Sequence, residues 1–202
     1  PTSFEGFIGN ENLLLKATLA EQAAGHGEAQ VFIHGPGGSG KSHLAQAACY
    51  HAGSMGLPAA YWPLRQIGGQ LAAASEQIEA FALAVVDDVD ALVGQTQGEF
   101  LLFDLINRAR EARVPLLLTA SRPPADLPVK LADLASRLTW GAVMAVHLPG
   151  DGEKIELLRS RAQARGLEMP HATAQWMLGH LPRDVGTLLE ALDRLDRQSM
   201  IA

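Results

Sequence analysis

The stretch that decides the fold reads Gly35-Pro36-Gly37-Gly38-Ser39-Gly40-Lys41-Ser42. It fits the pattern G-x-x-x-x-G-K-[ST], in which the glycines let consecutive backbone N–H groups turn inward around a phosphate. Lys41 would add a positive charge next to the β- and γ-phosphate oxygens, and the Ser42 hydroxyl would be a ligand for Mg²⁺. These eight residues and the next one, His43, are the candidate nucleotide-binding residues of the loop.

The sequence on either side of this loop has the composition that a phosphate-binding loop requires. Before it, residues 30–34 (Gln-Val-Phe-Ile-His) form a short apolar run that is typical of a buried strand. After it, residues 42–48 contain good helix formers with an apolar face. The N-terminus of such a helix brings a partial positive charge to a phosphate. The alternative is a glycine-rich surface turn, which requires neither a strand before it nor a helix after it. Because both are present, we predict a nucleotide site.

Composition and charge narrow the class of protein. The chain has 202 residues, of which 48% are hydrophobic and 19% charged, as in folded globular proteins. A net charge of −6 argues against a basic groove for duplex DNA but leaves protein partners open. The single cysteine, Cys49, excludes an internal disulfide, and we expect a buried thiol in a cytoplasmic protein. The apolar runs are too short for a membrane span. Because the first residue is not Met, we expect the natural N-terminus to lie upstream.

Short apolar runs alternate with helical patterns over residues 1–149, which predicts an α/β domain. The runs expected to form strands are residues 31–34, 58–62, 82–87, 114–119 and 143–148. Because helical patterns separate them, we predict a parallel five-stranded sheet flanked by helices. The expected helices include residues 11–24 with Asn10 as their cap, 99–112 and 131–138, whereas residues 66–84 are ambiguous.

Residues 150–202 lack strand patterns and predict a second, small, all-helical domain. Its helices are expected at residues 151–165, 171–178 and 183–197. Asp151 would cap the first helix, and Gly166 and Gly179 would end the first two.

Two acidic residues, Asp87 and Asp88, end an apolar run about 45 residues after the loop. The carboxyl ends of parallel strands face the ligand crevice of an α/β sheet. We therefore expect Asp87 to hold Mg²⁺, directly or through water, and Asp88 to orient or deprotonate the attacking water. Acids after a strand are a weak signal alone, because strand ends often meet polar loops. The complete loop upstream favours the catalytic interpretation.

A third strand end carries the candidate catalytic residue Ser121, within Thr119-Ala120-Ser121-Arg122-Pro123-Pro124. A hydroxyl at this position could reach the γ-phosphate or the attacking water. The alternative is an ordinary turn in front of two prolines.

Two arginines are candidates for contacts with a nucleotide. Arg137 lies on a short, mostly apolar helix, where it is either a solvated side chain or an arginine finger that completes a neighbour's phosphate site. The sequence alone does not separate these alternatives. Arg183 stands at the expected start of the last helix, where a cation is unfavourable with the helix dipole, and this mismatch favours a role toward phosphate over a plain surface position.

The loop, the acidic strand end, the Ser121 strand and the two arginines occur in the order typical of AAA+ ATPases, and the chain resembles that family over almost its whole length. Within the family it resembles the DnaA branch, because residues 118–124 (Leu-Thr-Ala-Ser-Arg-Pro-Pro) are similar to L-T-S-D-R-P-P. The resemblance places Ser121 at the sensor-1 position. Residues 4–10 resemble the segment that leads into the adenine pocket, which implies Ile8 as a nucleotide contact.

Further segments resemble the Hda family of DnaA-related regulators: residues 103–108 (Phe-Asp-Leu-Ile-Asn-Arg), 131–141 and 192–199. This resemblance implies that the protein binds ADP or ATP with Mg²⁺ and takes part in regulatory inactivation of DnaA. The implied partners are a DnaA-type initiator and the sliding clamp. Arg137 would be the finger offered to the initiator's ATP, and Arg183 the sensor-2 arginine. The resemblance also places a clamp-binding peptide before this sequence and continues the lid beyond it.

Two other functions remain open at this point. One is the AAA+ core of a DnaA-type initiator, which the acidic charge and the lack of a following helix-turn-helix pattern disfavour. The other is an autonomous ATPase such as a helicase loader, for which no substrate-gripping loop is evident. Because the loop is intact, hydrolysis by the chain itself stays open, as does a homo-oligomer. Direct DNA binding is expected to be weak or absent.

Overall fold

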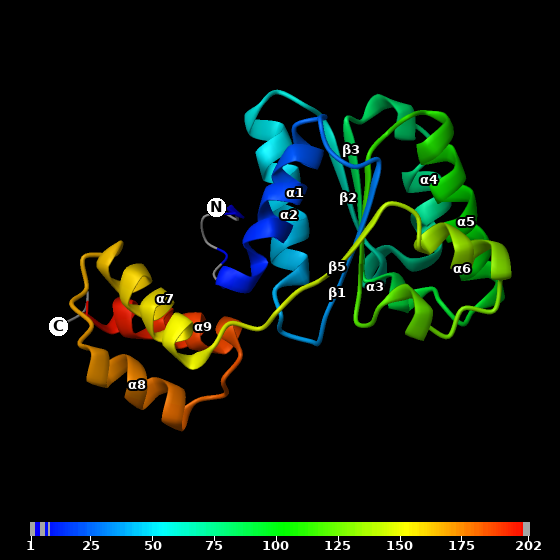
Figure 1. Ribbon diagram of the computed structural model, residues 1–202. Coiled ribbons are helices and arrows are strands. Elements are labelled where there is room, and N and C mark those ends of the chain that lie inside the picture. The colour runs from blue at the N-terminus through cyan, green and yellow to red at the C-terminus, as the bar shows by residue number, and fades with distance from the viewer. Residues whose placement is uncertain (1–2, 5–6, 8, 200–202) are drawn as a thin grey trace. The chain divides into compact units, whose positions relative to one another are not determined.

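The computed structural model describes residues 3–4, 7 and 9–199, which divide into two compact units (Figure 1). The first, which we call the sheet unit, contains residues 11–147 and the described residues up to Phe7. The second, the helical unit, contains residues 148–199 with residues 9–10.

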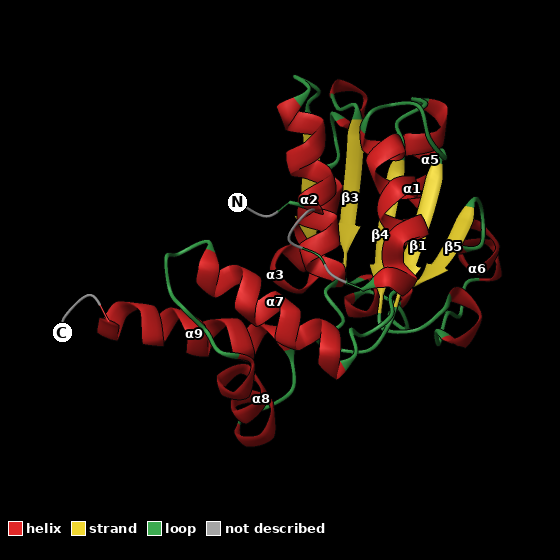
Figure 2. Cartoon of the chain, turned by 60° about the vertical axis from the view of Figure 1, so that its left-hand side comes forward, coloured by secondary structure: helices red, strands yellow, loops and turns green. Residues whose placement is uncertain are grey.

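The centre of the sheet unit is a fully parallel sheet with the strand order β2-β3-β4-β1-β5 (Figure 2). Its strands are β1 (Gln30–His34), β2 (Ala59–Pro63), β3 (Leu83–Asp87), β4 (Leu116–Ala120) and β5 (Ala142–Ala145). The predicted parallel five-stranded sheet flanked by helices is therefore confirmed. Because all strands run the same way, the loops that follow β1, β3 and β4 meet at one edge.

Helices cover both faces of the sheet, and alternate strand residues belong to two separate cores. On one face Val31 and Ile33 pack with α1 (Leu13–Ala23) and α2 (Lys41–Ser54). On the other face Phe32 belongs to a core that includes side chains of further helices. Those are α4 (Leu71–Ala74), α5 (Thr96–Glu111) and α6 (Ala132–Leu138). Burial of apolar side chains on both faces explains why the strand sequences are nearly continuous hydrophobic runs.

The ambiguous region at residues 66–84 consists of short pieces. They are α3 (Leu64–Ile67), α4, and 3₁₀ turns at Gly68–Gln70 and Ile78–Ala80, before β3 begins. Further 3₁₀ turns occupy Val89–Ala91 and Pro124–Asp126.

The beginning of the first helix differs from the expectation. Residues Asn10–Asn12 form a 3₁₀ turn, and α1 begins only at Leu13. The buried side chain of Asn12 forms two hydrogen bonds of 2.9 Å with the backbone of His147, one as donor to the carbonyl and one as acceptor from the N–H. An amide can make both bonds at once, so Asn12 connects the start of α1 to the chain just after β5.

The helical unit consists of α7 (Asp151–Gln163), α8 (His171–His180) and α9 (Val185–Ser199). Its core contains Leu158, Ala162, Ala174, Met177, Leu188 and Leu192. Helix α8 continues through Gly179, contrary to the expectation, and His180 stacks on Trp176 one turn earlier. Helix α9 begins two residues after Arg183, and Asp184 caps it by accepting a 2.8 Å hydrogen bond from Thr187 N–H. Within the described residues, no helix is long and apolar enough to cross a membrane.

Candidate functional site

The phosphate-binding loop connects β1 to α2 through two glycines in the left-handed region. Gly38 has φ 76° and Gly40 has φ 91°, conformations in which a side chain would be strained. A Cβ at Gly40 would also lie 2.4 Å from the ring of Phe7, which covers the loop from outside. Helix α2 begins at Lys41, so its first backbone N–H groups have no partner within the helix. The loop therefore offers the unpaired donors that a phosphate requires.

Lys41 is buried, and its ammonium group lies against its own loop. It donates hydrogen bonds to the carbonyls of Gly35 (2.8 Å) and Pro36 (3.0 Å). Burial lowers the pKa of Lys41, while the nearby carboxylates of Asp88, Asp90 and Asp87 oppose this shift in part. The loop follows β1 and the acids end β3, so both lie at the same edge of the parallel sheet.

Ser39 adds a second sign of a binding loop. Its hydroxyl is buried and has no hydrogen-bond partner among the described residues. Unpaired buried hydroxyls are uncommon in ordinary turns. Together with the open start of α2 and the ammonium of Lys41, this observation shows that the residues present fit a nucleotide phosphate.

Asp87 ends β3 as a buried carboxylate between the two neighbouring strands. Its Oδ2 accepts a 2.6 Å hydrogen bond from the hydroxyl of Tyr61 on β2. Its Oδ1 accepts one of 2.5 Å from the hydroxyl of Thr119 on β4. Burial and the hydrogen bond to Asp87 raise the pKa of Tyr61 further above neutral pH, and the phenol is a hydrogen-bond donor to Asp87. Both oxygens of Asp87 thus have fixed directions.

Asp88 has a strained backbone and an ion pair. Its φ of 61° is uncommon for a residue other than glycine. Its N–H donates to the Thr119 hydroxyl at 2.9 Å, and its Oδ2 accepts a 2.7 Å bond from Nε of Arg65 on α3. Because backbone strain of this kind persists only where the surroundings enforce it, Thr119 is a structural determinant of this strand end.

Ser121 lies at the same edge of the sheet, where both its hydroxyl and its backbone N–H are hydrogen-bonded to Asp90. The Ser121 hydroxyl donates to Oδ1 of Asp90 at 2.5 Å, and its N–H donates to Oδ2 at 2.8 Å. The hydroxyl is therefore already bonded to a carboxylate. The charge of this carboxylate opposes the lowering of the pKa of Lys41 by burial.

The expected ligands of a magnesium ion at this edge are Ser42 and Asp87. Ser42 is the second residue of α2, directly after Lys41. Among the described residues, no group of three or more His, Cys, Asp or Glu side chains is arranged to hold a metal ion. Mg²⁺ in nucleotide sites takes one or two protein oxygens and completes its shell with phosphates and water, so the donor set fits.

The segment before α1 lies against the start of α2. Phe7 stacks on His43 with a centroid distance of 6.0 Å, and His43 Nε2 lies 3.1 Å from the carbonyl oxygen of Ser3. His43 is thus enclosed by the segment that resembles an adenine-binding element. Ile8, the expected nucleotide contact, lies outside the described residues.

Arg137 lies at the opposite end of β1 from the loop. The Gln30 amide, at the first residue of β1, donates to the carbonyls of Arg137 (2.8 Å) and Trp140 (3.0 Å). The loop begins at Gly35, directly after the last residue of β1. Five strand residues span about 17 Å, so the fold separates Arg137 from the chain's own phosphate site. The fold thus brings the phosphate-binding loop and the acids at the end of β3 together, whereas Arg137 lies at the other end of the sheet.

Arg183 belongs to the helical unit, where it pairs with the first residue of α7. Its Nη1 donates to Oδ2 of Asp151 at 3.1 Å, and both side chains are more than half exposed. Such a pair contributes little to stability, so it leaves Arg183 free to exchange partners.

Sequence reasoning missed Tyr61, Thr119, Arg65 and Asp90, all of which contact the predicted acids or Ser121. Thr119 stood within the quoted stretch around Ser121, and its position as the last residue of the expected strand 114–119 was the available signal. Tyr61 and Arg65 had none, because their roles depend on the order of strands in the sheet.

Comparison with known proteins gives a family match, a sequence relative and similar solved structures. Residues 151–202 match the family described as "Hda, lid domain". An uncharacterized protein of Haemophilus influenzae is 36% identical over 201 residues, covering 99% of this chain and 87% of that protein. Among solved structures, the replication initiator DnaA bound to AMPPCP and single-stranded DNA has a TM-score of 0.79 at 20% identity. That match covers 96% of this chain, which spans 64% of the DnaA chain. Domain III of Thermotoga maritima DnaA also has a TM-score of 0.79 at 20% identity, covering 95% of this chain and 85% of that domain.

The parallel sheet, its glycine loop beside an acid-ended strand, and the separate three-helix unit define an AAA+ nucleotide-binding fold. Within this class, the lid match and the DnaA-like fold decide the branch. The chain belongs to the Hda/DnaA-like AAA+ proteins.

Proposed function

We propose that this protein binds ADP or ATP with Mg²⁺ and regulates DNA replication by promoting hydrolysis of the ATP held by a DnaA-type initiator. Its membership of the Hda/DnaA-like proteins supports a replication role. The loop supplies backbone N–H groups and Lys41 to the phosphates, and Ser42 and Asp87 hold the metal. The metal neutralises phosphate charge when it is bound.

The observation that carries the proposal is the separation of Arg137 from the chain's own loop by the length of β1. An arginine at that place cannot stabilise charge on the nucleotide bound at Gly35–Ser42. It can serve a nucleotide that a neighbouring molecule presents, as an arginine finger does. We therefore assign Arg137 to a partner's ATP.

The remaining site residues act on the chain's own nucleotide. Asp88 orients or deprotonates water, although its ion pair with Arg65 occupies one of its oxygens. Ser121 acts through Asp90 rather than by itself, since its hydroxyl is bonded to that carboxylate. Arg183 is proposed as the sensor-2 arginine of the lid.

The test uses full-length protein, DNA-loaded sliding clamp and ATP-bound initiator, because the resemblance to the Hda family implies the clamp and the initiator as partners. Wild-type protein should accelerate hydrolysis, and Arg137→Ala should reduce the acceleration about 100-fold or more while binding its own nucleotide normally. Arg159→Ala, an exposed arginine on α7, is the control and should behave as wild type. Undiminished acceleration with Arg137→Ala would exclude the finger role.

The second candidate is autonomous ATP hydrolysis, which the proximity of Lys41 to Asp87 and Asp88 favours. In that case the purified protein alone hydrolyses ATP, Asp88→Asn abolishes the turnover, and Arg137→Ala matters only at concentrations where copies associate. A rate independent of Asp88 would exclude this candidate.

A further inference from the structure

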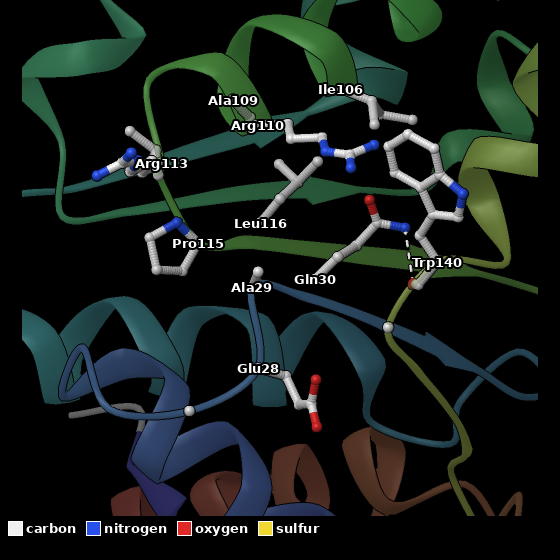
Figure 3. A pocket seen from close by; sticks show the side chains of 13 residues that line it. Glu28, Ala29, Gln30, Ile106, Ala109, Arg110, Arg113, Pro115, Leu116 and Trp140 are labelled. Carbon is white, nitrogen blue, oxygen red and sulfur yellow. Dashed lines mark hydrogen bonds between the residues drawn. The ribbon is translucent and has the colours of Figure 1, made fainter.

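Trp140 lies between two arginine side chains. The guanidinium carbon of Arg137 lies 3.8 Å from the centre of the Trp140 ring, and that of Arg110 lies 4.0 Å from it. At these distances one ring face has room for a single stacked guanidinium, so the two cations occupy opposite faces. Figure 3 shows Arg110 extending from α5 to the ring. We call this three-layer arrangement the arginine–tryptophan stack.

The backbone that carries the stack is fixed to the start of β1. The Gln30 amide donates to the carbonyls of both Arg137 and Trp140, and the second bond is drawn in Figure 3. The next residue, Gly141, has φ 70°, and a Cβ there would lie 2.0 Å from the Gln30 carbonyl oxygen. The position of the Trp140 backbone is therefore set by the sheet.

The ring itself borders open space. Trp140 and Arg110 line a cavity of about 660 Å³ at the edge of the sheet opposite to the phosphate loop, with an apolar wall that includes Ile106 and Pro115 (Figure 3). On this side Arg110 fills the space beside the ring. Arg110 therefore covers the face of the ring that borders the cavity, on the side away from Arg137.

Stacking leaves the hydrogen-bonding edge of Arg137 available. A guanidinium is planar, and its N–H donors lie in that plane. Aromatic rings can therefore cover its two faces without blocking the donors. Phe103 lies 5.8 Å from the Arg137 guanidinium as a second aromatic neighbour. None of the ion pairs among the described residues includes Arg137 or Arg110. Arg137 is thus oriented by aromatic contacts alone, with its donors open to a phosphate.

We propose that Trp140 is a positioning residue for Arg137, with Arg110 supporting the ring from its other face. This inference rests on the proposed function of Arg137 as a finger. Trp140 does not contact the partner's nucleotide. It limits the orientations of a flexible side chain before the partner arrives, and so lowers the entropy lost when Arg137 binds phosphate.

The kinetic test compares Trp140→Leu with Trp140→Phe in the initiator assay. Trp140→Leu should lower the maximal stimulation about tenfold with an unchanged half-saturating concentration, because the finger is misplaced while the docking surface is kept. Trp140→Phe keeps an aromatic face and should retain at least about half of the stimulation. Trp176→Leu removes a tryptophan that stacks on His180 in the helical unit and is the matched control. Thermal unfolding and nucleotide affinity confirm that each variant is folded.

A second measurement does not depend on the initiator. Stacking on Trp140 should shift the Nε–H proton signals of Arg110 and Arg137 upfield in NMR spectra, and Trp140→Leu should remove both shifts. Unshifted signals in the wild type overturn the stack, and shifted signals with full stimulation by Trp140→Leu overturn its positioning role. If Arg137→Ala retains full stimulation, the finger itself fails, which is a separate result from a failure of Trp140 alone.

Discussion

The Nε–H of Arg65 donates a 2.7 Å hydrogen bond to Oδ2 of Asp88 and so connects α3 to the end of β3. The Oδ2 atom that accepts this hydrogen bond has one direction fewer in which it can accept a bond from a water molecule. The proposed base is thus partly engaged by a residue of the same chain.

We predict that Arg65→Gln raises the intrinsic ATP hydrolysis of the purified protein several-fold, because it frees Asp88. Steady-state phosphate release measures this. Arg159→Gln breaks another arginine–carboxylate pair, with Glu156 on α7, and should leave the rate unchanged. A lower rate in Arg65→Gln would mean that the arginine assists the reaction.

Thr119→Val should destabilise the protein by about 2–3 kcal/mol, because valine has the same shape but leaves Asp87 Oδ1 and the Asp88 N–H without their partner. Urea unfolding at neutral pH gives this number. Thr119→Ser keeps the hydroxyl and should cost less. A loss of stability in Thr119→Ser with none in Thr119→Val would show that the methyl group, and not the hydrogen bonds, stabilises the site.

Lys41→Ala should abolish nucleotide binding measured by calorimetry, because it removes the ammonium that faces the phosphates. Lys154→Ala is the control, since Lys154 is also buried but belongs to the helical unit. Unchanged affinity in Lys41→Ala would mean that the loop is not the nucleotide site.

Glu99 gives a pH-dependent prediction. Burial raises its pKa, but hydrogen bonds from the backbone N–H groups of Lys130, Gly94 and Leu131 outweigh this, so the pKa in the folded protein lies below the ordinary value of 4.5. Because the pKa is lower in the folded than in the unfolded protein, ionised Glu99 stabilises the fold at pH values above 4.5. This stabilisation is lost as the pH falls through the pKa of the folded protein.

The free energy of unfolding should therefore drop as the pH falls below about 4.5, and Glu99→Gln should be less stable than wild type at pH 7 with a smaller acid dependence. Urea unfolding across pH 3–7 checks this, with Glu21→Gln on the exposed part of α1 as control. Parallel profiles for wild type and Glu99→Gln would contradict it.

The features that could be predicted from the sequence are those that consist of consecutive residues. The loop and the acid-ended strand each consist of neighbouring residues, and the alternation of strands and helices led to the correct fold class. The predicted roles of Asp88, Ser121, Arg137 and Arg183 remain predictions.

The features that the sequence did not predict depend on distant contacts. Tyr61 and Thr119 meet at Asp87 only because β2 and β4 flank β3. Asn12 bonds His147 across 135 residues, a contact that no local pattern indicates. Gln30 and Arg137 are separated by 107 residues. No local pattern shows which of several strands will be neighbours.

The placement of the phosphate loop and Arg137 at opposite ends of β1 makes the molecule directional. Any contact in which Arg137 reaches a neighbour's phosphate joins two different surfaces, head to tail, and has no two-fold axis. Repeated contacts of this kind close into a ring where the rotation between neighbours allows it, and otherwise give an open assembly with one loop and one arginine uncovered at its ends. The length of such an assembly is then decided by a partner that carries only one of the two surfaces.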